Sequence, residues 1–245
     1  MKLTSLAASL ALVLTACNAP HEQSDKPHAT SLTSDRERAS YLVGLDLAKQ
    51  MQPLADEVDI DLVVQALRSA NAHEKLLLAD AEIETARQQF TRHMREKHAS
   101  DQKALAAKNA ADGDALLKVN AGNAGVQTIA SGLQVLVLQD ATGPKPNADD
   151  TVDVSWIVKR PDGFSLEDSY AAGHSTGFPL NRVPPGVAEA IEQMPMSAKY
   201  RFWIPGRLLY GEDGRGGDIG PNQLLIYDIE LLAIAGQPGG HPVED

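Results

Sequence analysis

The chain has 245 residues, which is enough for one or two domains. Its formal net charge of -11 argues against nucleic acid as a partner, because surfaces that bind phosphate backbones carry an excess of lysine and arginine. Aromatic residues make up only 4% of the sequence, so a group of aromatic side chains at one site is informative. The many alanine, glutamate, glutamine and lysine residues indicate that a good part of the chain is helical.

The N-terminal segment has the features of an export signal. Lys2 precedes the apolar run Leu3–Ala16, which is too short to span a bilayer comfortably. The run ends in "LTAC", which resembles the signal of bacterial lipoproteins and would make Cys17 the lipidated first residue of the mature protein. The alternative is an ordinary signal peptide that happens to contain a cysteine. Cys17 is the one cysteine of the sequence, so no intramolecular disulfide can form.

On the lipoprotein interpretation, residues 1–16 are the signal peptide and acyl chains on Cys17 anchor the protein to a membrane. Asn18 does not resemble the aspartate that is often linked to inner-membrane retention. We therefore expect a place in the bacterial cell envelope, with the outer membrane favoured, facing the periplasm or the exterior. Residues 17–33 are polar and without periodicity, which predicts a flexible tether.

Two helices are predicted after the tether. The first covers residues 34–51, with Ser34 as its N-cap, and the second covers residues 59–72. Each carries apolar residues at helical spacing. A third, much longer helix is predicted from Asp80, as its cap, to about residue 120.

The long helix cannot bury a face of its own, and Gly113 is a point at which it could kink or end. Apolar positions are sparse beyond Met94, so the second half is predicted to be a solvated spacer. Short helices followed by one long helix suggest that two chains share a core. Residues 34–125 are therefore predicted to form an all-helical dimerisation domain with a long connecting helix.

The pattern changes period after residue 125, and the rest of the chain reads as an α+β domain over residues 126–236. One short helix is predicted from Pro185 to about Gln193. It lies among four predicted strands of an antiparallel sheet, at residues 133–140, 150–160, 197–205 and 222–234. Residues 237–245 are predicted to be a loose tail.

Three kinds of site are considered and set aside. The glycines of "YGEDGRGGDIGPN" do not have the G-x-G-x-x-G spacing, and a strand follows them, so a surface loop explains them better than a nucleotide site. In "HMREKH", His93 and His98 are five residues apart and point to different sides of a helix, which disfavours a metal site. No serine lies in a G-x-S-x-G motif, so nucleophilic catalysis has no candidate. No cofactor or metal is predicted.

The C-terminal part of the chain resembles the FKBP-type peptidyl-prolyl cis-trans isomerases. The matching segments occur in family order: "GLQVLVLQDATGPKPNADDTVDVSW", "PDGFSLEDSY", "FPLNRVPPGVAEAIEQMPMSAKYRFWIP" and "LLYGEDGRGGDIGPNQLLIYDIELL". The upstream segments "ASYLVGLDLAKQM", "LLLADAEIETARQQF" and "LLKVNAGNAGVQTIASGLQ" resemble the macrophage-infectivity-potentiator subgroup. That resemblance implies an antiparallel half-barrel sheet wrapped on one short helix, at each tip of a V-shaped homodimer.

The resemblance also implies a reaction and a site. An apolar pocket that desolvates an X-Pro imide and favours its twisted geometry lowers the rotation barrier, with no covalent step and no cofactor. The partners would be unfolded or partly folded polypeptides that contain X-Pro bonds. Matched residue by residue, the catalytic positions are Tyr210, Glu167 and Trp156, and the substrate-binding positions are Leu166, Phe178, Val183, Pro184, Val187, Ile219 and Tyr227.

Several of these positions depart from the family pattern. Trp156 stands in place of tyrosine, and Tyr227 in place of phenylalanine. Leu166 and Glu167 stand in place of Phe-Asp. Val187 replaces the tryptophan that normally forms the pocket floor. Each of these residues, taken singly, could also be an ordinary core residue of a small domain.

Pro184 is the sharpest departure, because the family usually has isoleucine here and uses its backbone N–H to bind the substrate. Proline has no N–H, and losing one such bond suggests a roughly three- to tenfold effect. Macrolide ligands of the family would bind more weakly for the same reason. We therefore favour an envelope isomerase of reduced activity, which assists folding of exported proteins, and the alternative is a non-catalytic dimeric chaperone on the same fold. A purely structural lipoprotein spacer is a third interpretation.

Overall fold

The computed structural model of the chain describes residues 30–238. The predicted signal peptide, Cys17, most of the predicted tether and most of the predicted tail lie outside the described residues. The chain divides into two compact units between Ala79 and Asp80. No helix within residues 30–238 is long and apolar enough to cross a membrane.

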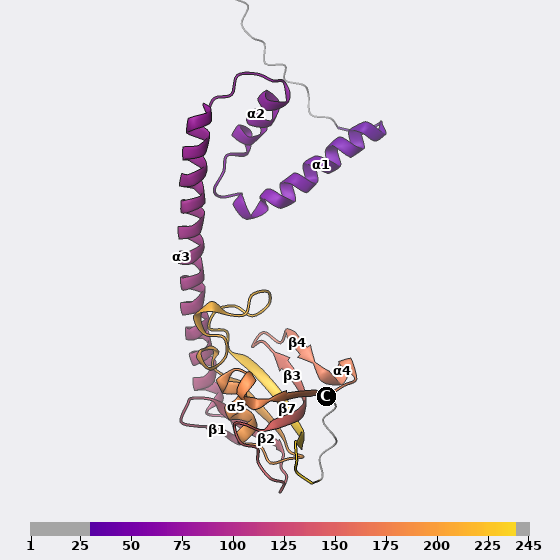
Figure 1. Cartoon of the computed structure of the whole chain (residues 1–245), viewed down its shortest axis with the longest axis vertical. Helices are drawn as coiled ribbons and strands as arrows, with labels where there is room; N and C mark the ends of the chain where they lie inside the picture. Colours follow the sequence, from indigo (N-terminus) through magenta and orange to yellow (C-terminus); the bar gives the residue numbers. More distant parts are fainter. Residues whose placement is uncertain (1–29, 239–245) are drawn as a thin grey trace, which may run out of the picture. The chain divides into compact units, whose positions relative to one another are not determined.

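The first unit consists of two helices, α1 (Asp35–Met51) and α2 (Ile60–Asn71), with a 3-10 turn, η1 (Gln52–Leu54), after α1 (Figure 1). Ser34 caps α1 as predicted, because its hydroxyl accepts from the Glu37 amide while the Glu37 carboxylate accepts from the Ser34 amide. Asp59 caps α2 through its carboxylate, which accepts from the amides of Asp61 and Leu62. No residue of α1 or α2 is buried in the described chain. The apolar stripes of both helices are therefore open.

The second unit begins with α3 (Asp80–Asn120), a single helix of 41 residues (Figure 1). Asp80 is its first helical residue, and the helix continues through Gly113 instead of ending there. The second half is not the solvated spacer that the sparse apolar pattern predicted. Ala106, Gly113 and Asn120 are buried, and a Cβ on Gly113 would lie 3.3 Å from Leu224 Cβ. The sequence pattern did not predict this contact, because the helix approaches Leu224 through small residues and not through a wide apolar stripe.

The remainder of this unit, called the sheet domain below (residues 126–234), contains a seven-stranded antiparallel sheet. The strand order is β1-β2-β6-β7-β3-β4, and β5 also pairs with β3. The four predicted strands are present, whereas β1, β4, β5 and the short helix α4 (Ser169–Ala172) are too short to produce a readable periodicity. The strands are β1 (Val126–Thr128), β2 (Gln134–Gln139), β3 (Thr151–Lys159), β4 (Ser165–Asp168), β5 (Thr176–Pro179), β6 (Lys199–Ile204) and β7 (Leu225–Ile234).

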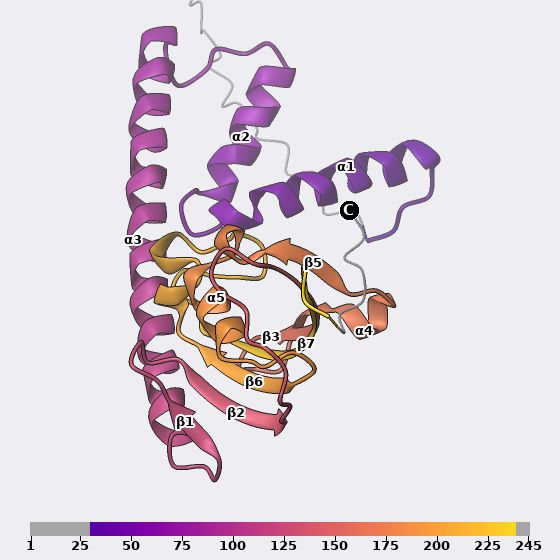
Figure 2. The ribbon, with the colours of Figure 1, turned by 60° about the horizontal axis from the view of Figure 1, so that its bottom comes forward.

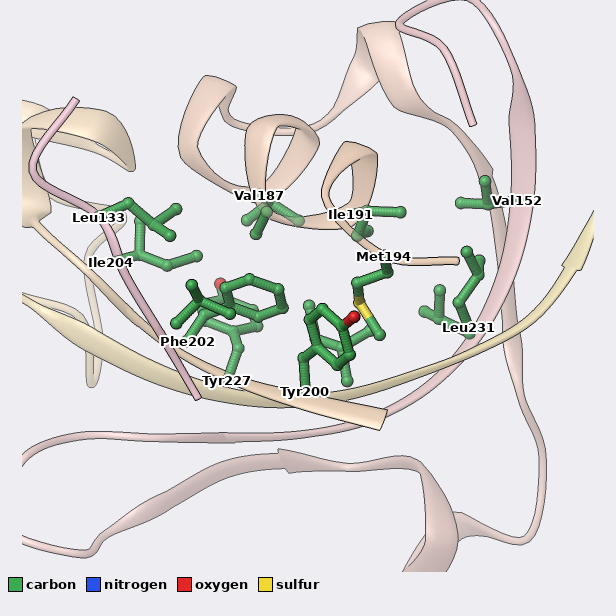
Figure 3. Close-up of a cluster of buried hydrophobic side chains, with 14 of the residues drawn as sticks. Leu133, Val152, Val187, Ile191, Met194, Tyr200, Phe202, Ile204, Tyr227 and Leu231 are labelled. Atoms are coloured by element: carbon green, nitrogen blue, oxygen red, sulfur yellow. The ribbon is translucent and has the colours of Figure 1, made fainter. Parts of the chain in front are cut away.

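The sheet curves around one short helix, α5 (Pro185–Glu192), which lies inside the curve (Figure 2). Side chains alternate along β6 and β7, so one face of each strand points at α5. Val187 and Ile191 of α5 face Phe202 and Tyr227 of those strands across a closed apolar core (Figure 3). The architecture is thus α+β, with the half-barrel sheet and single helix that the resemblance implied.

Three 3-10 turns complete the sheet domain and shape one end of it. The turn η2 (Leu180–Arg182) leads into α5, and η3 (Gly206–Leu208) follows β6. The turn η4 (Gly211–Asp213) opens a long loop that ends at β7. This loop and the start of α5 come together at the edge of the core and leave a cleft there.

Candidate functional site

The cleft has a volume of about 600 Å³ and lies between the start of α5, the strands β3 and β7, and the loop that follows β6. The structure brings together almost all of the residues that the sequence assigned to a site. The residues that line the cleft are Trp156, Val158, Leu166, Glu167, Arg182, Val183, Pro184, Val187, Tyr210, Arg215, Gly216, Asp218, Ile219 and Tyr227. Phe178 is the one predicted residue that does not line the cleft directly.

The floor of the cleft is apolar and belongs to the core. Val187 on α5 is only 2% exposed, and Tyr227 on β7 is 4% exposed. Both side chains point into the cluster between α5 and the sheet (Figure 3). Burial raises the pKa of Tyr227, and the neighbouring Tyr210 and the carboxylate of Glu167 raise it further, so its hydroxyl stays neutral. Val187 and Tyr227 therefore belong to the core and also form the floor of the pocket. The sequence had left open whether each was a core residue or a pocket residue.

One wall is aromatic and is built on neighbouring strands. Trp156 on β3 stacks on Phe178 of β5, with ring centroids 5.2 Å apart. The same indole meets Tyr227 edge-on, with centroids 6.0 Å apart. Both separations are typical of favourable aromatic pairs. Phe178 therefore acts behind Trp156, as a support for the wall.

Glu167 contacts the other side of this wall. The register of β3 with β4 places Val158 opposite Glu167, so that Trp156 and Glu167 lie near each other across the pair of strands. The indole Nε1 of Trp156 donates a hydrogen bond of 2.7 Å to Oε1 of Glu167. A hydrogen bond to a carboxylate is stronger than one between neutral groups. Glu167 thus holds the orientation of the Trp156 ring.

The opposite rim carries Tyr210 and charged residues. The guanidinium of Arg215 donates to the Tyr210 hydroxyl at 3.3 Å and lies 5.6 Å from the ring centroid. Because the Tyr210 oxygen accepts from Arg215, its own proton can be donated to an acceptor in the cleft. Arg182 and Asp218 complete a rim of mixed charge.

The sequence analysis missed these charged rim residues. Arg215, Gly216 and Asp218 belong to "YGEDGRGGDIGPN", from which the resemblance assigned only Tyr210 and Ile219 to the site. The signal that could have found them is their place in the chain, between the predicted residues Tyr210 and Ile219. Arg182 has a comparable signal, since it directly precedes Val183.

Pro184 lies at the mouth of the cleft, where α5 begins. It is the N-cap of the helix, with φ -54 and ψ 144, and Pro185 follows at the first helical position. The Pro184 carbonyl accepts from the amides of Val187 and Ala188, at 2.9 and 3.2 Å. Pro184 therefore supplies an acceptor to the helix but has no backbone N–H to offer to a ligand.

The comparison with known proteins agrees with this geometry in both parts of the chain. Residues 36–137 match the family model of the domain amino terminal to FKBP-type peptidyl-prolyl isomerase, and residues 143–232 match that of FKBP-type peptidyl-prolyl cis-trans isomerase. The chain belongs to the FKBP-type peptidyl-prolyl cis-trans isomerases. This FKBP-type enzyme has both the helical and the catalytic domain of the family, in the order that the sequence indicated.

Relatives of this isomerase match it over most of their length. Outer membrane protein MIP of Legionella longbeachae is 31% identical over 206 residues, which cover 84% of this chain and 88% of that protein. The probable FKBP-type isomerase FkpA of Neisseria meningitidis is 32% identical over 214 residues, covering 86% and 78%. The crystal structure of FkpA from Escherichia coli superposes with a TM-score of 0.72 at 29% identity, covering 83% of this chain and 98% of that one. The chain is thus a peptidyl-prolyl isomerase of the MIP-like subgroup, and catalysis is favoured over the non-catalytic alternatives.

Proposed function

We propose that the cleft between α5 and the sheet is where this isomerase binds X-Pro segments, and that the enzyme assists the folding of exported proteins in the bacterial envelope. The observation that carries the first part is one cavity of about 600 Å³ with an apolar floor, an aromatic wall and the Tyr210 hydroxyl at its rim. An imide bond rotates slowly because its C–N bond has partial double-bond character. A dry, shaped cavity favours the twisted imide, whose carbonyl is less polar than that of the planar imide, and Tyr210 can bind a substrate carbonyl.

The test of the site is a proline-limited refolding assay with protein produced from Asn18 to Asp245. Removal of the side chain of Ile219 by Ile219→Ala widens the cleft and should lower kcat/KM several-fold. Tyr210→Phe removes the donor and should lower kcat/KM by about three- to tenfold. A rate that is unchanged in both variants would place the site elsewhere.

The envelope location rests on the N-terminal segment, and it is supported by the similarity to outer membrane protein MIP of Legionella longbeachae. We propose that Cys17 carries a lipid anchor. Mass spectrometry of the N-terminal peptide from membranes should find acyl chains on Cys17, and Cys17→Ser should move the protein from the membrane fraction to the soluble fraction. Membrane association that survives Cys17→Ser would contradict the anchor.

The open apolar stripes of α1 and α2 support a homodimer. Tyr41, Leu42, Leu62 and Leu67 are each more than half exposed, although helices of a stable fold normally bury such faces. A second copy of the chain supplies an identical stripe, which is the geometry of a symmetric interface. Light scattering should therefore give about twice the mass of one chain.

We also propose that the isomerase rate is reduced by the proline at the start of α5. Pro184→Ile restores an N–H at the cleft mouth and should raise kcat/KM by about three- to tenfold. Val187→Trp would restore a ring at the floor, but Val187 is already buried, so this change strains the core unless the ring turns into the cleft. Pro184→Ile should therefore be tested alone first and together with Val187→Trp second. Affinity for a macrolide ligand of the family should rise in parallel.

A further inference from the structure

The loop from Tyr210 to Asn222 supplies two sides of the cleft, through Tyr210 and Ile219. Gly211, Gly214, Gly216 and Gly217 within it have positive φ angles of 56, 67, 75 and 56°. Glycine in this region has access to many conformations in the absence of restraint. The loop can therefore keep Ile219 in the cleft wall only if other parts of the chain hold it.

The loop is held at several points. Its two ends are joined by the Asn222 amide, which donates to the Gly211 carbonyl at 2.6 Å. The Arg215 amide donates to the Ile219 carbonyl at 3.1 Å, and Arg160 Nη1 donates to the Asp218 carbonyl at 3.4 Å. These contacts come from the sheet domain itself.

One further contact comes from α3. The side-chain amide of Asn109 donates to the carbonyl of Pro221 at 2.8 Å, across 112 residues of sequence and in a partly buried position. The fit is close, because a Cβ on Gly220 would lie 3.2 Å from Nδ2 of Asn109. Pro221 is buried and only two residues from Ile219.

The part of α3 that carries Asn109 is itself fixed to the sheet domain. Ala106 is buried one turn before it, and Gly113 packs on Leu224 one turn after it. At the end of the helix, Nδ2 of Asn120 donates to Oε1 of the buried Gln134 at 2.8 Å. Asn109 is therefore a rigid point of attachment for the loop.

We propose that Asn109 is a positioning residue of the isomerase, which acts on catalysis through Pro221 and the wall residue Ile219 without touching the substrate. The long helix is then part of the catalytic apparatus and does more than join two domains. This inference rests on the cleft being the isomerase site. It gives α3 a role that neither the composition of the helix nor the family match assigns.

The test compares two isosteric variants on the same helix. Asn109→Asp removes the donor and turns an acceptor toward the Pro221 carbonyl. Asn120→Asp alters a polar attachment of α3 to β2, through Gln134, which lies away from the loop. Both add one negative charge to α3, so the comparison separates the contact with the loop from the added charge. Each is made in the chain from Asn18 to Asp245, beside Ile219→Ala as a reporter of the cleft.

We expect Asn109→Asp to lower kcat/KM for a proline tetrapeptide about three- to tenfold, with most of the change in KM. Hydrogen exchange of the Arg215 and Ile219 amides should become faster in this variant. Asn120→Asp should lower the thermal midpoint at least as much as Asn109→Asp does. It should nevertheless leave kcat/KM and the hydrogen exchange of the loop within about twofold of the starting protein.

Three outcomes would overturn the proposal. If Ile219→Ala lowers the rate and Asn109→Asp does not, the cleft assignment stands and the role of Asn109 fails. If Asn120→Asp loses as much rate as Asn109→Asp, the effect is general destabilisation. If neither Ile219→Ala nor Asn109→Asp changes the rate, the cleft is not the site, and the role of Asn109 fails with it.

Discussion

The two units of this isomerase differ in how far their apolar side chains are buried. In α1 and α2, Tyr41 is 59% exposed and Leu62 is 56% exposed. In the sheet domain, Phe202 and Leu231 are completely buried between α5 and the strands. The sheet domain can close its core within one chain because a curved sheet surrounds a helix, whereas two short helices have too little surface to cover each other. We therefore propose that the first unit is a surface for association, whereas the second has a closed core of its own.

The largest expected effect breaks the association without touching catalysis. Leu62→Asp with Leu67→Asp places charges on the open stripe of α2 and should weaken the dimer by about 4 kcal/mol or more, roughly a thousandfold in Kd. Light scattering should then give the mass of one chain, while kcat/KM for a tetrapeptide stays unchanged. Gln65→Asp adds one negative charge to the same helix at a polar position and should leave the dimer intact. A dimer that persists in the double variant would show that α2 is not at the interface.

The next effect is confined to the sheet domain. A Cβ on Gly206 would lie 2.1 Å from the carbonyl carbon of Asn222, so Gly206→Ala must push the cleft loop away from η3. We expect a loss of about 3 kcal/mol in the free energy of unfolding. Urea titration followed by tryptophan fluorescence reports on this domain, since Trp156 and Trp203 both lie in it.

Gly44→Ala is the matched control for this prediction. Gly44 lies in α1 with no atom within 4 Å of an added Cβ, so the substitution should not move the tryptophan transition. Equal shifts for Gly206→Ala and Gly44→Ala would mean that the two units unfold together.

A smaller effect is expected from the hydrogen bond between Trp156 and Glu167 in the cleft wall. Glu167→Leu removes the acceptor of the Trp156 indole and should lower kcat/KM about threefold, since one hydrogen bond is lost. Glu167→Gln keeps a side-chain carbonyl oxygen and should stay near the starting rate. In a Trp156→Phe background, Glu167→Leu should have no further effect. A loss of about threefold in kcat/KM on adding Glu167→Leu to Trp156→Phe would instead show that Glu167 acts directly on the substrate. That is the catalytic role that the family resemblance implied.

The smallest expected effect concerns the start of α1. Hydrogen bonds from the Ser34 and Thr33 amides hold the pKa of Glu37 at about 2, below its ordinary value of 4.5. The lowered pKa means that the charged form stabilises the helix start, fully above pH 4.5, and that this contribution is lost as the pH falls toward 2. Circular dichroism should show α1 losing helicity over this interval, and Glu37→Gln should reduce the pH dependence. An identical acid transition in both proteins would assign the loss to other groups.

Local patterns predicted the regular elements well. Ser34, predicted as the N-cap, marked the start of α1, and the alternation in the strands that became β2, β3, β6 and β7 was readable because each is half-buried on a sheet. The short strands β4 and β5 gave no such signal, although they position Glu167 and Phe178. The pocket residues themselves came from the resemblance to a family, not from periodicity.

The sequence by itself determined the helices α1, α2, α3 and α5 and the strands β2, β3, β6 and β7, and it marked Pro184 as a residue with no donor at a helix start, because caps, alternation and the chemistry of proline are local properties. Only the tertiary structure decided that Glu167 meets the indole of Trp156, that Phe178 supports that ring from behind, and that the second half of α3 is packed on the sheet domain. Some of these contacts join residues that are distant in sequence. In the contact of α3 with the sheet domain, small side chains let the helix approach closely. Asn109 and Pro221 are 112 residues apart, and no periodicity in either segment indicates that they meet.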